Sequence, residues 1–235
     1  MISQTESPLG GAQDEIDAAL SPEATPEERR ARLRDRLISE AWRLISTEGL
    51  QAVQARRVAQ AASCSVGAIY NVFPDLDELI LRANIITMRQ LGEAAAAAGA
   101  TLDAALTVGE RVRRLSQVYV GFAFAFAYER NWRSLFDYRA TYRKPYPDWY
   151  REAQISAFRD LGHGVLGAPV DTAERLAMVE TLWAAVHGVV SVAMEARFRD
   201  ISRPDIERQV DLLTRLLSGG VDAMLAGGAS QRGRA

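Results

Sequence analysis

Residues 53–73 contain polar side chains that can donate and accept hydrogen bonds, together with two short sets of apolar residues at helical spacing. The apolar positions predict two very short helices, joined by a polar turn at Ser63-Cys64-Ser65. The stripes expected to be buried are Val58, Ala59 and Ala62 in the first helix, and Val66, Ile69 and Phe73 in the second. Helices this short are stable only when they pack on neighbours. A seven-residue helix held rigidly in this way, with small residues facing outward, suits insertion into the major groove of DNA.

The net charge of −2 hides an uneven distribution of charge along the chain. Residues 1–28 carry seven acidic and no basic side chains, whereas residues 29–73 carry eight arginines against three acids. Residues 74–235 carry equal numbers of each sign. The positive field therefore falls on the segment with the short helices, as in a nucleic-acid-binding region. A solvated arginine-rich helix face is the alternative interpretation.

Length and composition limit the class of protein. A chain of 235 residues with 48% hydrophobic residues can form one large helical domain, or a small domain with a larger one. The sequence has no apolar run of bilayer length, and its acidic start lacks the features of a secretory signal. A single cysteine excludes a disulfide framework and a multi-cysteine metal site. We therefore expect a cytoplasmic protein without membrane contact, metal ion or cofactor.

Helical periodicity and capping signals predict the remaining elements. Thr25-Pro26-Glu27-Glu28 has the pattern of a capping box and begins a helix over about 26–48, which Gly49 ends. Further N-terminal caps are expected at Asp75, at Asp171-Thr172-Ala173-Glu174 and at Ser202. The helices expected after the short pair lie near 76–97, 102–128, 131–139, 147–166, 171–199 and 204–225. No strand pattern is convincing, so the predicted fold is all-α.

The last predicted helix has an apolar stripe typical of an interface. Val210, Leu213, Leu217 and Val221 step along one face of it, and we predict that they form a dimer interface. The helix over 171–199 is apolar around most of its circumference, which indicates that it is covered on several sides. A buried central helix in a monomer is the alternative. We favour two such helices pairing with a second copy in a four-helix bundle.

Taken together, these features resemble the TetR family of bacterial transcription regulators. The family pattern is a first helix followed by a helix-turn-helix of the form V-A-x-A-A-x-x-S-x-G-x-I/L-Y-x-x-F. The resemblance covers about residues 30–82 and is carried by Val58, Ala59, Ala61, Ala62, Ser65, Gly67, Ile69, Tyr70 and Phe73. Trp183, His187 and Gly188 resemble the Trp-His-Gly signature of one class of ligand domain in this family. The aromatic segment from Phe122 to Phe136 resembles that class as well.

The resemblance implies a division into a DNA-binding and a ligand-binding part. We predict an acidic disordered tail over 1–24 and a three-helix helix-turn-helix domain over 25–82. A helical bundle for ligand binding and dimerisation is expected over 83–226, followed by a flexible tail over 227–235. The helix over 76–97 joins the two domains and is the expected lever between them.

Each residue of the motif has a physical use on DNA. Ser65 suits the N-cap of the second short helix, and Gly67 lets its backbone approach the base edges closely. Ala68 suits a thymine methyl, and Asn71 offers an amide to a base or phosphate. Tyr70 suits a phosphate contact that fixes register rather than sequence. The predicted DNA-binding residues are Arg30, Arg56, Arg57, Ser65, Val66, Gly67, Ala68, Tyr70 and Asn71.

The chain departs from the family pattern at several positions. Gln54 is a weaker cap than the usual Thr or Ser, and Ser63 replaces the turn glycine. Basic residues are common in the family at the positions of Asn71, Val72 and Leu76, so this chain has fewer cationic phosphate contacts there. The arginines of the first helix, with Arg56 and Arg57, are expected to compensate.

Aromatic residues are unusually dense between residues 119 and 150. Pockets for organic ligands are largely apolar, with a few polar groups that orient the ligand. By resemblance, such a pocket lies inside the C-terminal bundle. Its predicted residues are Phe122, Phe126, Phe136, Tyr142, Trp183 and His187. Core packing is the alternative for each aromatic residue, and a hydrogen-bonded core position is the alternative for His187.

The sequence therefore predicts a homodimeric regulator of transcription that binds a palindromic double-stranded DNA operator. The favoured version is a repressor that a small apolar or aromatic effector releases. A helical ligand-binding module, or a degenerate regulator without operator recognition, is the first alternative. An all-α enzyme is the second, although no nucleophile–base pair or paired carboxylates stand at a meaningful spacing.

Overall fold

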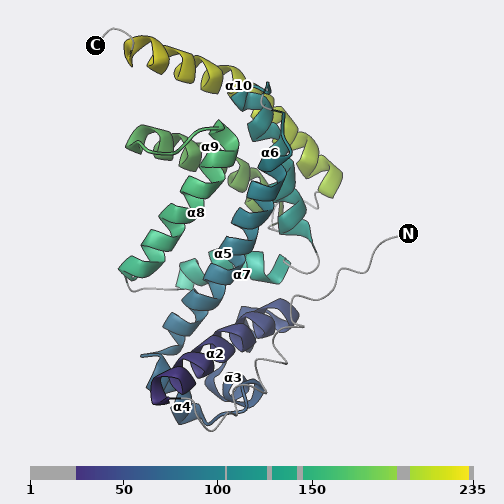
Figure 1. Cartoon of the computed structure of the whole chain (residues 1–235). Coiled ribbons are helices and arrows are strands. Elements are labelled where there is room, and N and C mark those ends of the chain that lie inside the picture. The colour runs from purple at the N-terminus through teal and green to yellow at the C-terminus, as the bar shows by residue number, and fades with distance from the viewer. Residues whose placement is uncertain (1–24, 104, 126–128, 142–144, 195–201, 233–235) are drawn as a thin grey trace. The chain divides into compact units, whose positions relative to one another are not determined.

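The computed structural model describes residues 25–103, 105–125, 129–141, 145–194 and 202–232. Within these ranges the regular structure is helical, without strands, which confirms the predicted all-α fold. Contacts divide the chain into two compact units, Met1–Ala83 and Asn84–Ala235. The boundary falls inside the long helix α5 (Leu76–Ala100; Figure 1). The tail predicted over 1–24 lies outside the described residues.

The first unit begins with the predicted capping box at α2 (Pro26–Glu48). The Thr25 hydroxyl accepts a hydrogen bond from the Glu28 amide at 3.2 Å, and the Glu28 carboxylate accepts one from the Thr25 amide at 2.7 Å. These hydrogen bonds with the Thr25 backbone and side chain hold the pKa of Glu28 below its ordinary value. Gly49 ends the helix with a φ of +91°, a conformation that favours glycine. The capping prediction at both ends of α2 is therefore confirmed.

Three short elements follow and pack on α2. They are a 3₁₀ turn at Leu50–Ala52, α3 (Ala55–Ala61) and α4 (Val66–Val72). Contacts join α2 to α3, α3 to α4 and α2 to α4. Their shared core contains completely buried side chains, among them Leu37 of α2, Val58 of α3 and Ile69 of α4. Helices of seven residues are thus kept folded by tertiary burial rather than by their own propensity.

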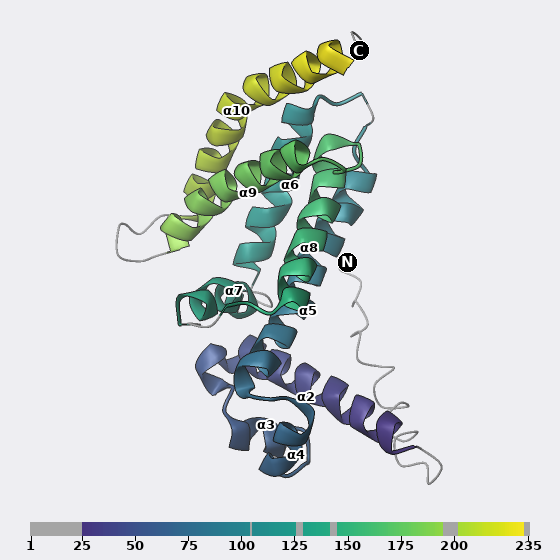
Figure 2. The same ribbon diagram turned by 90° about the vertical axis from the view of Figure 1, so that its left-hand side faces the viewer.

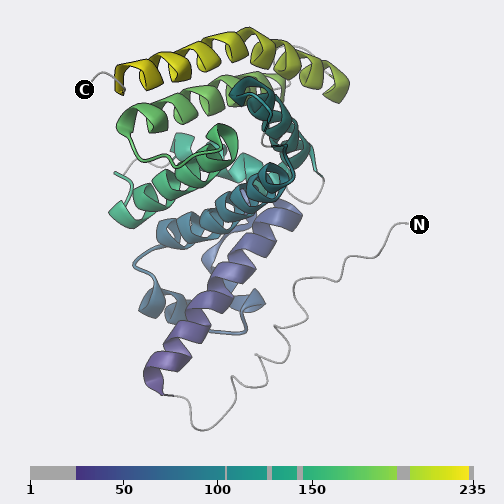
Figure 3. The same ribbon diagram turned by 45° about the horizontal axis from the view of Figure 1, so that its top comes forward.

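The second unit is a bundle of longer helices that continues α5 beyond Asn84. Its members are α6 (Val108–Phe124), α7 (Glu129–Thr141), α8 (Asp148–Leu166), α9 (Ala173–Met194) and α10 (Arg203–Arg232). Helix α10 packs on α6 and α9, and α8 packs on α6 and α9. Figure 3 shows α10 running alongside α9, and Figure 2 shows α8 lying along the part of α5 that belongs to this unit. The core therefore lies between helices distant in sequence.

Several predicted helix bounds need correction. Helix α6 begins at residue 108 rather than near 102, because Thr107 and Glu110 form a capping box that the sequence analysis missed. Helix α9 begins at residue 173, because Thr172 rather than Asp171 accepts the capping hydrogen bond, from the Arg175 amide at 3.2 Å. The predicted ends at 128 and 199 lie outside the described residues.

The predicted C-terminal tail is partly helical. Helix α10 reaches Arg232, whereas the sequence predicted an end near 225 and a flexible tail over 227–235. Glycine lowers helix stability by about 1 kcal/mol relative to alanine but does not forbid the helix. Gly227 and Gly228 therefore do not end α10, and residues 233–235 lie outside the described residues.

Helices α6 and α10 pack closely at a glycine. A Cβ atom built on Gly109 would lie 2.2 Å from the Cβ of Ser218 and 2.9 Å from its Cα. These are fixed atoms close to the backbone, so a larger residue forces the two helices apart. Gly121 on the same helix has nothing within 4 Å of its built Cβ. Only the first glycine is thus required by packing.

We expect Gly109→Ala to destabilise the protein by about 1–3 kcal/mol, since overpacking displaces neighbouring backbone. Gly121→Ala is the matched control on the same helix and should be neutral or stabilising by up to about 1 kcal/mol. Thermal unfolding followed by circular dichroism measures both changes. Equal melting temperatures for the two variants would contradict the close packing of α6 and α10.

Candidate functional sites

Helix α4 presents most of the predicted DNA-binding residues to solvent. The Ser65 hydroxyl accepts a hydrogen bond from the Ala68 amide at 3.2 Å, so Ser65 is its N-cap as predicted. Ile69 and Phe73 are buried and anchor the opposite face. The exposed predicted contacts on and beside α4 are Ser65, Val66, Gly67, Tyr70 and Asn71, with Ala68 half-buried. The helix therefore has one buried and one open face.

Val66 was expected in the buried stripe, and this prediction is wrong. Its side chain is 36% exposed, because it stands in the first turn of α4, where the chain has just left the core. Val66 was also predicted to be a DNA-binding residue on the open face beside Gly67, and its exposure agrees with that prediction. A Cβ added to Gly67 would meet only the Ser65 hydroxyl, at 3.9 Å, among the described residues, so this part of the helix is open.

The turn between α3 and α4 has the geometry that the sequence analysis anticipated. Ser63 has a φ of +50°, the left-handed conformation that usually requires glycine. Hydrogen bonds from the amides of Ser63 and Cys64 to the carbonyls of Gln60 and Ala59, at 3.2 and 2.9 Å, fix the turn. Gln54 makes no side-chain capping bond to α3, consistent with its expected weakness as a cap.

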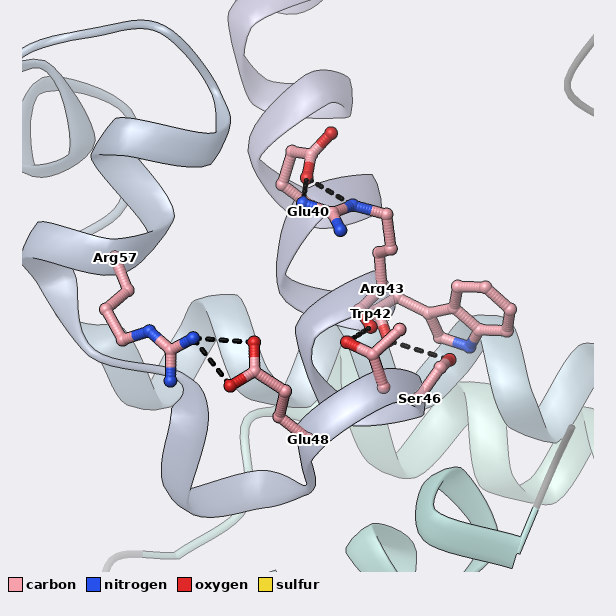
Figure 4. A network of polar contacts seen from close by, with 7 residues as sticks. Glu40, Trp42, Arg43, Ser46, Glu48 and Arg57 are labelled. Carbon is pink, nitrogen blue, oxygen red and sulfur yellow. Dashed lines mark hydrogen bonds and ion pairs between the residues drawn. The ribbon is translucent and has the colours of Figure 1, made fainter. Parts of the chain in front are cut away.

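Arg57 of α3 forms an ion pair within the first unit. Its guanidinium donates to both carboxylate oxygens of Glu48, at 2.6 and 2.7 Å, and thereby links α3 to the end of α2 (Figure 4). Both side chains are more than two-fifths exposed, so the pair is worth at most about 1 kcal/mol to stability. Arg56 and Arg30 are exposed. Arg57 is thus accessible, but a carboxylate competes with phosphate for it.

The second unit contains an aromatic cluster in which Tyr119 and Trp132 are buried and the tyrosine hydroxyl joins its neighbours by hydrogen bonds. The Trp132 indole donates to the Tyr119 hydroxyl at 3.0 Å, and that hydroxyl lies 2.7 Å from Nδ1 of His187. Trp183 stacks on the His187 ring at a centroid distance of 4.7 Å, and Phe136 lies 4.1 Å from it. Burial raises the pKa of Tyr119 far above its ordinary value. The tyrosine is therefore neutral at physiological pH.

A small apolar cavity of about 50 Å³ adjoins this cluster. Residues of α5, α6, α8 and α9 line it, and Ser116, Tyr119 and Trp183 are the side chains with polar atoms among them. Of the predicted pocket residues, Trp183 lines the cavity, whereas Phe122, Phe136 and His187 do not. Phe122 is buried in the neighbouring core. Phe126 and Tyr142 lie outside the described residues.

Sequence reasoning missed Tyr119 as the polar centre of this region. The aromatic density around it was a signal, but its partners Trp132 and His187 lie 13 and 68 positions away, on two other helices. Only tertiary packing brings the three together. Within the described ranges, no three His, Cys, Asp or Glu side chains are placed to hold a metal ion.

The predicted dimer stripe faces the chain's own core. Val210 and Val221 are buried, and Leu213 and Leu217 pack against the same two core clusters. The stripe was assigned to a partner because periodicity reveals an apolar face but not what covers it. Among the described side chains of α10, the large apolar ones that remain exposed are Leu212 and Leu216, at 53% and 73%.

Helix α9 is long and apolar enough to cross a membrane by length and composition. Its residues Val179, Leu182, Val186 and Val190 are instead buried among the helices of the second unit. On its other side, Val192 remains 51% exposed. The apolar character of α9 is therefore that of a bundle helix with one uncovered side.

The fold and the open face of α4 define a helix-turn-helix DNA-binding regulator with a second, helical unit. Residues 37–83 match the family model described as bacterial regulatory proteins of the tetR family. Over these residues the chain accordingly has the DNA-binding segment of TetR-family transcription regulators, and this match points to a DNA-binding regulator rather than to an enzyme. No similar sequence was found among curated proteins.

Solved structures share the fold over most of the chain. A TetR transcriptional regulator from Rhodococcus sp. RHA1 is 21% identical, with a TM-score of 0.57, over 80% of this chain and 96% of its own. Another transcriptional regulator from the same organism is 20% identical, with a TM-score of 0.54, over 79% and 96%. The multidrug binding protein EbrR, complexed with imidazole, is 20% identical, with a TM-score of 0.54, over 77% and 93%. The assignment of the second unit to the Trp-His-Gly class of ligand domains stays a prediction.

We expect Glu48→Gln to strengthen DNA binding several-fold at low salt, because it releases Arg57 and removes a negative charge near the DNA. Glu40→Gln removes the same charge from α2, where the carboxylate pairs with Arg43 (Figure 4), and serves as the control. Fluorescence anisotropy with labelled duplex at several salt concentrations measures both. Weaker binding by the Glu48 variant would show that the ion pair positions α3 instead.

Proposed function

We propose that this protein is a homodimeric repressor whose binding to a palindromic operator is relieved by a small apolar or aromatic effector. The observation that carries the proposal is the open face of α4, capped by Ser65 and anchored by Ile69, within the segment that matches the family. A cytoplasmic location follows from this function, because the operator is there.

On DNA, we assign two kinds of contact to this face. Gly67 and Ala68 let the start of α4 approach base edges, and the Asn71 amide reads a base or holds a phosphate. Tyr70, which is half exposed, places its hydroxyl on a phosphate and fixes register. Arg30, Arg56 and Arg57 supply positive charge to the backbone, with Arg57 leaving Glu48 to do so.

The effector is proposed to act in the cavity beside Tyr119. Ligand pockets usually have volumes of about 300–1,000 Å³, so a cavity of about 50 Å³ must widen before it holds an organic molecule. Leu91 and Ala95 of α5 form part of its wall. An effector that prefers a widened bundle therefore selects a state in which α5 is displaced, and DNA affinity falls by the difference in binding energy.

Helix α7 supplies a second link to α5. The Ser134 hydroxyl donates to the Asn84 side chain at 2.9 Å, and the Asn84 amide donates to the Ser134 carbonyl at 3.4 Å, with both residues buried. Trp132 of the same short helix holds Tyr119. Because unpaired buried polar groups are costly, α7 and α5 are expected to move together when the aromatic cluster rearranges. EbrR, a multidrug binding protein of similar fold, was solved in complex with imidazole, which supports the proposal that this chain binds a small molecule.

A second copy is proposed to cover α9 and α10. Leu212 and Leu216 of α10 and Val192 of α9 are large apolar side chains that the chain itself leaves exposed. Helices α9 and α10 lie alongside each other (Figure 3), so two copies form a four-helix interface. A dimer places two α4 helices in successive major grooves when they stand about 34–36 Å apart.

The main test of this function is sequence-selective DNA binding. Selection from random duplexes should enrich a palindrome, and Asn71→Ala should lose about 1–3 kcal/mol of discrimination at one base pair of each half-site. Tyr70→Phe should weaken binding about equally to all sequences, since a phosphate contact carries no sequence information. Thr47→Ala, on the exposed surface of α2, is the control.

If wild-type protein enriches no sequence and binds all duplexes equally weakly, the regulator has lost operator recognition. The absence of basic residues at Asn71, Val72 and Leu76 is the feature that favours this second candidate. The helical ligand-binding module would then be the better account of the chain.

We expect Leu216→Glu to dissociate the dimer, because it places two charges in an apolar interface. Ile155→Glu is the matched control, since Ile155 of α8 is also exposed, at 37%, but lies outside the proposed interface. Sedimentation velocity should show a monomer for the first variant and a dimer for the second. The proposed interface would be contradicted if both variants sedimented as dimers, or if the wild-type protein sedimented as a monomer.

A further inference from the structure

Among the described residues that line the cavity beside Tyr119, none carries a charged side chain. The lining consists of aliphatic side chains with three residues that have polar side-chain atoms, Ser116, Tyr119 and Trp183. Nothing in this lining compensates the desolvation of a carboxylate or an ammonium group, which costs several kcal/mol in an apolar site. The cavity therefore selects an uncharged ligand.

The direction of the hydrogen bonds around Tyr119 is set by the groups that meet there. The Trp132 indole has only a donor, so the tyrosine oxygen accepts at 3.0 Å. The tyrosine proton then needs an acceptor of its own, and Nδ1 of His187 lies 2.7 Å away. This arrangement satisfies each of these polar groups, and it requires the tautomer of His187 that carries its proton on Nε2.

With its proton given to His187, Tyr119 has one lone pair left to offer. Ser116 is in the same situation, because its hydroxyl donates to the Val112 carbonyl at 2.7 Å. Both oxygens can accept a further hydrogen bond, and neither has a proton to give. A ligand group that meets them must therefore be a donor. A carbonyl, ether or nitro oxygen placed against them would face another acceptor.

We propose that the effector is an uncharged molecule with an apolar or aromatic body and a hydroxyl group that donates to the Tyr119 oxygen. The aliphatic walls from four helices receive the body, and the Trp183 ring stacks on it or lies edge-on to it. This inference rests on the proposed function for the place where the effector binds. It goes beyond that function by giving the ligand a chemical class.

The experiment uses three probes of nearly equal size, 4-ethylphenol, 4-ethylanisole and 4-ethylbenzoate. Isothermal titration on the full chain should rank the phenol about five- to tenfold tighter than the anisole, which lacks the donor. The benzoate should bind most weakly or not at all. A ranking with the anisole or the benzoate first would overturn the proposal, and so would the absence of binding by all three.

Two variants locate the hydrogen bond. Tyr119→Phe should reduce the preference for the phenol over the anisole to within about twofold, while Tyr146→Phe, outside the cavity, should preserve it. Trp132→Phe keeps the Tyr119 oxygen and removes a competing donor, so it should maintain or increase the preference. It also serves as the second variant if Tyr119→Phe does not fold. An unchanged preference in Tyr119→Phe, or its loss in Trp132→Phe, would contradict the assignment.

A parallel measurement separates this inference from the proposed function. Operator affinity is followed by fluorescence anisotropy with and without 4-ethylphenol. If the phenol binds with the expected preference and DNA affinity stays the same, the ligand class holds and the repressor mechanism fails. If another probe binds tightest and releases DNA, the mechanism holds and the ligand class fails.

Discussion

The structure depends on the burial of Ile69 and Phe73 beneath α4. A helix of seven residues does not form alone, and its hydrogen bonds are too few to compensate the ordering of its backbone. Packing of α4 on α3 and α2, with Ile69 and Val58 both completely buried, supplies the missing stability. The same burial fixes which side of α4 remains open. One packing constraint therefore both folds the helix and orients the residues proposed to meet DNA.

In the second unit, the comparable constraint is the satisfaction of buried polar groups. Tyr119, Trp132 and His187 remain in an apolar bundle because each has a partner among the others. Asn84 of α5 and Ser134 of α7 likewise satisfy each other by a hydrogen bond between their side chains. These bonds favour one arrangement of the helices over others, since a shift leaves donors or acceptors unpaired. A ligand that supplies a hydrogen bond of its own can therefore select a different arrangement.

Local signals in the sequence were enough to predict much of the first unit. The capping boxes, the Ser65 cap and the two short apolar stripes act over a few residues, so they can be read without a structure. Thr107 and Glu110 carried the same kind of signal and were overlooked. Val66 satisfies the periodicity and is still exposed, because it stands in the first turn of a short helix.

Interactions between distant residues could not be predicted in this way. The stripe on α10 was correctly found to be apolar, yet periodicity could not show that α6 and α9 cover it and leave Leu212 and Leu216 outside. The predicted pocket included Trp183 but not Tyr119, because the cavity forms only where four helices meet. Sequence patterns likewise could not show that Arg57, a predicted phosphate contact, pairs with Glu48. Arg57 must leave this carboxylate before it binds a phosphate.

Cleavage of operator DNA from a reagent tethered to Cys64 tests the central claim most directly. Cys64 is the chain's single cysteine, is partly accessible, and lies in the turn just before α4. An iron chelate attached to it should cut bound duplex in two clusters about one helical turn apart, symmetrically about the centre of the palindrome. A single cluster, or cuts scattered evenly along the bound duplex, would contradict the insertion of paired α4 helices into the grooves.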